Sequence, residues 1–183
     1  GLQALYDFSE GSGTTARDTS GVGAPLNLSL VGTGYEWVDD GIALSGAGFQ
    51  SSGAATKIIN AVRTTNEYTI EAWVTPNSAR PPSPGWIAGV ARDSNVRNSV
   101  LSQGFWANAP TNVFEHKMRS SGAYSARVAS PAVVAGQPVH IVVTRFANGY
   151  YRLYTNGVRR SVNASPGTLT WDTTLPVLVG ADG

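Results

Sequence analysis

The clearest pattern of apolar and polar positions in this chain lies between Gln137 and Val158. Two runs rich in β-branched and aromatic residues flank the dipeptide Asn148-Gly149, which readily adopts positive φ. This combination predicts a β-hairpin, and a hairpin of this kind indicates an all-β sandwich.

The charges of the hairpin indicate its register. A two-residue loop would set Arg145 opposite Arg152, and like charges that face each other across two strands are destabilising. A three-residue loop instead sets Val143 opposite Leu153, with Gly149 in the left-handed position of a bulge. We therefore expect the three-residue loop.

A second stretch, Glu67–Thr75, alternates strictly between apolar and polar side chains. Alternation with a period of two predicts a strand with one buried face, and we interpret this one as a central strand. Together with the hairpin it supplies the inward set that we expect to form the core of two sheets: Tyr68, Ile70, Ala72, Val74, Ile141, Val143 and Leu153.

Weaker patterns fill the rest of the chain. Leu2–Phe8 alternates and predicts a first strand, Thr56–Arg63 has apolar residues at helical spacing and predicts one short helical turn, and the prolines of Asn77–Pro84 predict a loop. Shorter strands are expected at residues 26–30, 35–38, 42–44, 85–91, 99–104, 113–119, 124–128, 159–162, 169–171 and 177–180.

Composition narrows the class of protein. The length suits a single domain over residues 1–183, and 21 glycines and 10 prolines spread along it are typical of many short strands. A net charge of +1, with 14% charged residues, offers no basic field for nucleic acid. Without cysteine there is no thiolate site, and no apolar run approaches the roughly 20 residues that insert across a membrane.

Four segments in order carry a family resemblance: Leu5–Gly13, Asp18–Gly21, Tyr68–Val74 and Leu153–Gly157. In their order and spacing they resemble the laminin-G-like, concanavalin-A-like jelly-roll domains of secreted bacterial proteins. The resemblance implies a two-sheet antiparallel jelly-roll sandwich with at most one short helix, ligand loops at its rim, and a secreted or cell-surface location. It does not imply one function, because such folds serve as lectins, adhesion modules, glycosidases and spacers.

The resemblance also implies a further strand. Members of the family continue after a segment like Leu175–Gly180 into a strand that pairs near the N-terminal one, and nothing of that pattern follows Gly183. We therefore expect the domain to lack its final C-terminal strand, so that a second chain or a C-terminal fragment completes the sheet.

The residues do not favour catalysis. Glu67 and Glu71 lie on one face of the same predicted strand, roughly 13 Å apart along it. Glycosidases need two carboxyl groups about 5 to 9.5 Å apart, so this pair does not fit. His116 and His140 have no nucleophile motif around them, and we expect His140 on a strand surface. A glycoside hydrolase or lyase is therefore the less favoured alternative.

Calcium is the cofactor that the resemblance implies, as a structural ion at Asp18. A calcium ion takes six to eight oxygen ligands, and here Val22–Pro25 replaces the asparagine-rich continuation that family members often carry after this turn. The alternative is an Asx-turn at Asp18 with no ion. Both interpretations stay open at the level of sequence.

Sugar binding requires exposed aromatic faces beside planar polar groups. Such residues meet between positions 86 and 116, and the candidate ligand set is Trp86, Arg92, Asp93, Asn98, Trp106 and His116, with Trp106 as its centre. Trp73 also lies on the polar face of its strand, although any tryptophan can instead pack a core. The sequence thus predicts a non-catalytic extracellular module that binds glycan. The alternative is a structural spacer or a protein-adhesion domain with an extracellular protein as partner.

Overall fold

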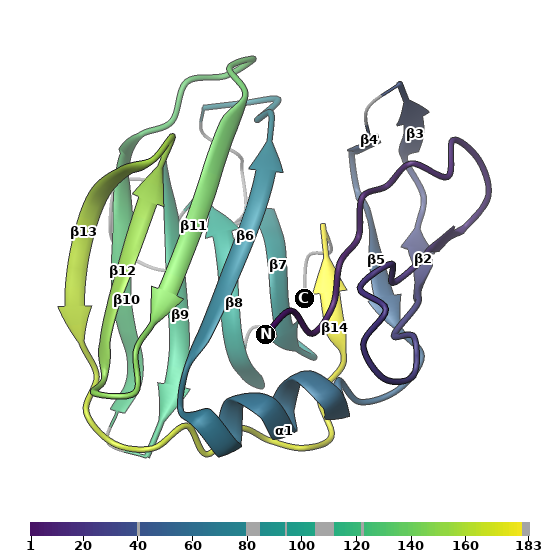
Figure 1. Cartoon of the computed structure of the whole chain (residues 1–183). Coiled ribbons are helices and arrows are strands. Elements are labelled where there is room, and N and C mark those ends of the chain that lie inside the picture. Colours follow the sequence, from purple (N-terminus) through teal and green to yellow (C-terminus); the bar gives the residue numbers. More distant parts are fainter. Residues whose placement is uncertain (40, 80–84, 94, 105–111, 122, 181–183) are drawn as a thin grey trace.

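The structure, a computed structural model, describes residues 1–39, 41–79, 85–93, 95–104, 112–121 and 123–180. Two antiparallel sheets face each other, and one helix closes one end of the sandwich (Figure 1). The predicted all-β jelly-roll sandwich is confirmed. Within the described residues, no helix is long and apolar enough to cross a membrane.

The larger sheet has eight strands, in spatial order β1 (Thr15–Ala16), β2 (Leu28–Gly32), β5 (Ala47–Ser51), β14 (Val177–Val179), β7 (Gly85–Ala91), β8 (Arg97–Gln103), β9 (Val113–Ser120) and β10 (Ala123–Ala132). The smaller sheet has four, in the order β13 (Val158–Ala164), β12 (Tyr150–Thr155), β11 (Val139–Arg145) and β6 (Tyr68–Val74). A separate hairpin pairs β3 (Tyr35–Val38) with β4 (Gly41–Leu44), and the helix is α1 (Thr56–Thr65).

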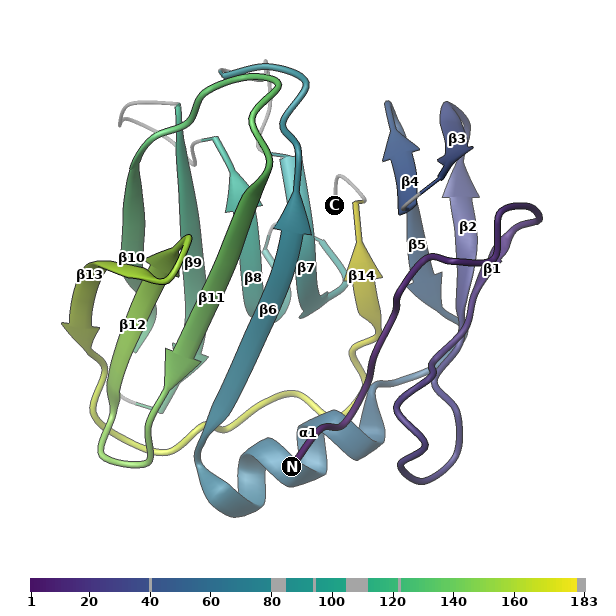
Figure 2. The same ribbon diagram turned by 45° about the horizontal axis from the view of Figure 1, so that its top comes forward.

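The two sheets differ in width, and this sets the shape of the molecule. Figures 1 and 2 show the four-stranded sheet in front of β7 to β10, while β14, β5 and β2 extend beyond its edge at β6. The N-terminal segment runs across the part that the smaller sheet leaves uncovered, where Tyr6 and Phe8 pack against the core. Phe8 meets Phe49 of β5 edge to face at 5.8 Å between ring centroids.

The hairpin of β11 and β12 has the predicted register. Val143 pairs with Leu153, and Phe146 donates its N–H to the carbonyl of Tyr150 at 2.8 Å, which leaves a three-residue loop. Gly149 has φ +88°, and a Cβ atom on it would lie 2.8 Å from the carbonyl oxygen of Ser165. Glycine is therefore required here both for the left-handed backbone and for the close approach of the next segment.

The core agrees with the predicted inward set. Ile141, Val143 and Leu153 are fully buried between the sheets, and the apolar face of β6 is half-buried against them. The outward residues of β6 alternate with that face, as its sequence indicates. The interpretation of β6 as a central strand is wrong, however, because it forms the edge of the four-stranded sheet. Alternation shows which face of a strand is buried and says nothing about how many neighbours the strand has.

Two predicted strands do not form. Leu2–Phe8 has no strand pairing, because Leu5 is held by the side chain of Asp18 and the backbone of Thr19, and Phe8 has φ +50°. Residues 169–171 form a loop instead of a strand, with Leu169 and Trp171 buried and Thr170 exposed. Conversely, the sequence does not predict β5. This strand is buried on both faces, so its short sequence of small residues shows no alternation of apolar and polar positions.

Candidate functional site

The predicted ligand residues do not form one surface. Trp86 on β7 is only 4% exposed and Asn98 on β8 is fully buried. The Asn98 side chain is used internally, because its amide bonds both the N–H and the C=O of Asp172, at 2.7 and 2.8 Å. Buried side chains offer no face to a sugar, so these two residues serve the interior. Trp106 lies outside the described residues.

Arg92 and Asp93 lie at the surface after β7 and form an ion pair of 3.3 Å with each other. Asp93 also accepts the N–H groups of Asn95 and Val96, which lowers the pKa of its carboxyl group. Its hydrogen bonds thus hold the turn between β7 and β8. Of the predicted ligand residues that the structure describes, this pair alone is placed at the surface.

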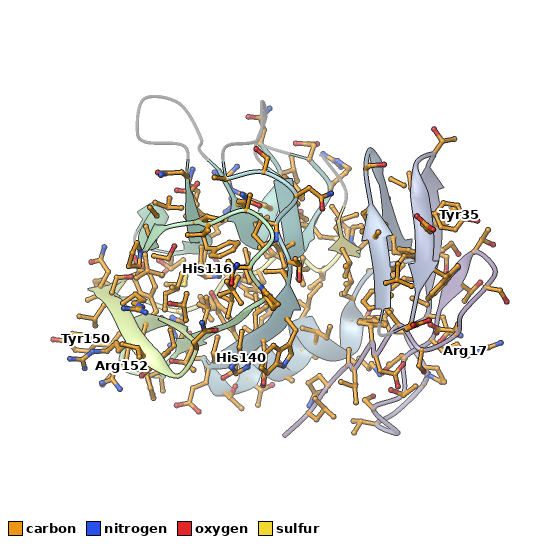
Figure 3. All side chains as sticks on the ribbon, turned by 90° about the horizontal axis from the view of Figure 1, so that it is seen from above. Arg17, Tyr35, His116, His140, Tyr150 and Arg152 are labelled. Atoms are coloured by element: carbon orange, nitrogen blue, oxygen red, sulfur yellow. The ribbon has the colours of Figure 1, made fainter. Side chains whose placement is uncertain are left out.

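His116 lies in the interior, between the two sheets, as Figure 3 shows. Its Nε2 atom lies 3.2 Å from the hydroxyl of Tyr68 on β6 and 3.0 Å from that of Ser99 on β8. Burial lowers the pKa of the imidazole to about 3. His116 is therefore a neutral internal group that connects the two sheets, and it is not available as a surface ligand residue.

The Asp18 carboxylate accepts hydrogen bonds from four other groups of the protein. Its two oxygens accept N–H groups of Leu5, Ser20 and Leu26, the second of these forming an Asx-turn, and Lys57 of α1 donates its ammonium group to Oδ2. Burial alone would raise the pKa of Asp18, but the hydrogen bonds from Lys57, Leu26 and Ser20 outweigh it and hold that pKa well below its usual range.

This donor set does not fit a calcium ion. Lys57 already supplies the positive charge, and its ammonium also donates to the carbonyl of Val22, an oxygen that the turn would otherwise offer to a metal. In the part of the chain that the structure describes, no group of three or more histidine and carboxylate side chains is placed to hold a metal ion. The arrangement matches the Asx-turn interpretation.

A surface cluster stands out on the outer face of the four-stranded sheet. Trp73 on β6 is 74% exposed, and its ring stacks on that of His140 on β11, with 4.5 Å between centroids and 20° between planes. The Nε2 atom of His140 lies 2.7 Å from Oε1 of Glu71. We call these three residues the Trp73 platform.

The register of β6 and β11 produces this platform. Trp73 pairs directly with His140, and facing residues of an antiparallel pair lie close enough for their side chains to interact. Glu71 lies two residues before Trp73 and therefore projects from the same face. Figure 3 shows His140 on the outside of the sheet, away from His116. Asn156 fixes the position of His140 by accepting its backbone N–H and donating to its carbonyl, both at 2.9 Å.

The platform has the chemistry of a contact surface for a ring-shaped ligand. His140 covers one face of the Trp73 ring, and the exposed fraction leaves the remainder open to a ligand. Glu71 beside it presents carboxylate oxygens that can accept hydroxyl protons. The sequence does contain the signal for this cluster, an aromatic residue at an outward position of an alternating strand, but the predicted set was centred on Trp106 instead.

Comparison with known proteins agrees with the fold. The profile of the concanavalin A-like lectin/glucanases superfamily matches residues 49–183. Domain 4 of AbnA, an extracellular arabinanase from Geobacillus stearothermophilus solved in complex with arabinotriose, superposes with a TM-score of 0.63 and 17% identity, over 99% of this chain and 84% of that one. No curated protein matches the sequence.

Two further similar structures are parts of larger chains. A Trypanosoma rangeli sialidase, in complex with a difluoro-nononic acid, gives a TM-score of 0.65 at 13% identity over 97% of this chain. The binding domain of botulinum neurotoxin serotype D gives 0.64 at 13% identity, also over 97%. The present chain spans 27% of the sialidase and 43% of the toxin domain, so these likenesses concern the fold alone.

Proposed function

The chain belongs to the concanavalin A-like lectin/glucanases superfamily, and from this premise we propose that it is a non-catalytic extracellular module that binds carbohydrate through the Trp73 platform. The observation that carries the proposal is the 74% exposure of Trp73, stacked on His140 beside Glu71. An indole ring offers an apolar face to the C–H patch of a pyranose, while the neighbouring carboxylate accepts its hydroxyls. The arabinanase domain that this fold resembles was solved with arabinotriose, which supports the ligand class.

The carboxylates on this face support a non-catalytic role. Glu67 directly precedes β6 and Glu71 lies four residues further on, within that strand, so the two are roughly 13 Å apart along it, whereas glycosidase pairs are separated by about 5 to 9.5 Å. Both are also engaged in structure. Glu71 contacts His140, and Glu67 accepts the N–H of Ala147 at 3.1 Å in the hairpin loop.

A Trp73→Ala variant tests the proposal. On a glycan array and then by calorimetry with the best soluble hit, the variant should bind about tenfold more weakly. It loses both the apolar contact area of the ring and the stacking contribution of about 0.5 to 1.5 kcal/mol, and about 1.4 kcal/mol corresponds to tenfold. The matched control is Tyr150→Ala, which removes a ring that is 51% exposed at the other end of the same sheet. The control should bind like the wild type, and both variants should keep its melting temperature.

Two results would contradict the proposal. Unchanged binding by Trp73→Ala would move the site elsewhere on the molecule. Absence of binding to every glycan on the array would favour the spacer or protein-adhesion alternative.

That alternative has one observation in its favour, the free edge of β6. This strand pairs only with β11 among the described residues, so half of its backbone groups point away from any strand, and such an edge accepts a strand from elsewhere. We propose that a second chain or a further segment pairs here and completes the sheet. Light scattering over a range of concentrations tests for a second chain. Pairing should also protect the outward amides of β6 from hydrogen exchange, whereas fast exchange at these alternate amides would show that the edge is unpaired.

A further inference from the structure

A cleft of 240 Å³ opens at the end of the sandwich opposite α1. It lies where β10 leads into β11 and where β12 turns into β13, two connections that meet at that end in Figure 1. Its walls are partly apolar, with Phe114 and Pro138 among them, and partly polar, with the amides of Gln137 and Asn156. Pockets for drug-sized ligands measure about 300 to 1,000 Å³, so this one suits a single ring-sized group.

The charge of the cleft is positive. Arg160 is the one charged side chain among the described residues that line it. Its Nε atom donates to the hydroxyl of Thr155 at 2.7 Å, and this is the guanidinium's one hydrogen bond in the described part of the chain. Because arginine carries five N–H donors, the bond to Thr155 orients the group while four donors remain for a ligand. A guanidinium fork oriented in this way matches a carboxylate, which it binds through two parallel hydrogen bonds.

One residue, Asn156, connects the cleft with the Trp73 platform. Asn156 lines the cleft, and the same residue forms two hydrogen bonds of 2.9 Å with the backbone of His140, whose ring stacks on Trp73. Its side-chain Oδ1 accepts the His140 N–H, and its own N–H donates to the His140 carbonyl. The order Trp73, His140, Asn156 therefore runs across the sheet from the platform to the cleft. A glycan that spans both places would have one sugar on Trp73 and another in the cleft with Arg160.

We propose that the cleft receives the carboxylate of an acidic sugar, so that the preferred ligands of this module are glycans that carry uronic acids or similar carboxylated residues. This inference rests on the proposed function, whose ligand class it narrows. Arg160 would bind the carboxylate, while the amides of Gln137 and Asn156 face the ring hydroxyls. Glu71 is the one carboxylate of the platform and already contacts Nε2 of His140, whereas no carboxylate is among the described residues that line the cleft, so the cleft itself does not repel an acidic ligand.

The test uses glucuronate and glucose as probes of the whole chain, followed by amide NMR. Glucuronate should shift the amides of residues 137–139 and 155–160, and glucose should shift them far less. Arg160→Gln should weaken glucuronate binding at least about tenfold, since hydrogen bonds to charged groups contribute about 1.5 to 3 kcal/mol. Arg159→Gln is the matched control, because it removes the same charge from the adjacent residue of β13, which does not line the cleft.

The outcomes separate this inference from the proposed function. If Arg160→Gln abolishes the preference for glucuronate while Trp73→Ala changes neither probe, the acidic site stands and the platform proposal fails. Equal binding of the two probes, or an Arg160→Gln variant that binds glucuronate like the wild type, overturns the inference. So does an equal loss in Arg159→Gln, because it would show attraction to the general charge of β13. The amide spectrum of each variant without ligand reports whether it is folded.

Discussion

Acid should destabilise this domain through His116, a histidine that the fold keeps neutral. Its side chain is fully buried, Nε2 is shared by the hydroxyls of Tyr68 and Ser99, and Nδ1 is buried without a hydrogen-bond partner among the described residues. Protonation would place a positive charge between the sheets and make both ring nitrogens donors, although Nδ1 has no acceptor among the described residues. The folded state therefore resists the proton that the unfolded chain accepts readily.

The sign and size of the effect follow from the two pKa values. Burial lowers the folded pKa of His116 to about 3, whereas an exposed histidine in the unfolded chain has a pKa of about 6.5. As pH falls below about 6.5 the unfolded state binds a proton and the folded state does not, so stability is lost down to about pH 3. At pH 4, about 2.5 pH units below the pKa of the unfolded histidine, the free energy of unfolding is lower by about 3 kcal/mol than at neutral pH. This is a large part of the 5 to 15 kcal/mol that is typical of a domain.

Urea denaturation between pH 7 and pH 4 measures this loss. The comparison protein is His116→Gln, which keeps a polar side chain and cannot titrate in this range. Between the two pH limits the wild type should lose about 3 kcal/mol more free energy of unfolding than the variant. Carboxylates with lowered pKa, such as Asp18 and Asp93, contribute equally to both proteins and cancel in the difference. A difference below about 0.5 kcal/mol would refute the assignment of His116 as a buried neutral group.

Two further predictions concern stability. Lys57→Met leaves the buried Asp18 carboxylate without its counterion and should lower the free energy of unfolding by about 3 kcal/mol in urea denaturation. Arg63→Met, at an exposed position of α1, is the control and should change it little. A chelator should leave the melting temperature of the wild type unchanged, and a clear fall would show that calcium is bound after all. Leu153→Ala empties a fully buried position and should cost about 2 to 5 kcal/mol in urea denaturation, against a small effect for Val162→Ala on the exposed face; a loss under about 1 kcal/mol would mean that the core face is misassigned.

The sequence predicts local structure well because its signals there are local. Asn148-Gly149 between two apolar runs determines both the hairpin and its register, and the alternation of β6 shows which face is buried. Leu2–Phe8 shows the limit of this reasoning, because a strand also needs a neighbouring strand with a free edge. Here the side chain of Asp18, in a turn, accepts the backbone N–H of Leu5 instead. The edge position of β6 depends in the same way on strands far away in the chain.

The site was harder to predict than the fold, for a related reason. Asn98 and His116 have the residue types of ligand-binding positions, but their partners Asp172 and Tyr68 lie 74 and 48 residues away along the chain. From the sequence alone, a polar side chain that hydrogen-bonds an internal group looks the same as one that is free to bind a ligand. The two are distinguished only when the positions of distant partners are known. Trp73 differs because its exposure follows from the period of its own strand.

The position of β14 has a consequence for how the domain folds. This three-residue strand pairs with β5 on one side and with β7 on the other, so it joins the two parts of the larger sheet. Val177 also donates its N–H to the hydroxyl of Ser51, 126 residues earlier. Closing so long a loop carries a high entropic cost, and topologies rich in distant pairings fold slowly. During synthesis from the N-terminus, β1, β2 and β5 can therefore pair only with one another, and they join β7 to β10 in one sheet only after the segment around Val177 has been made.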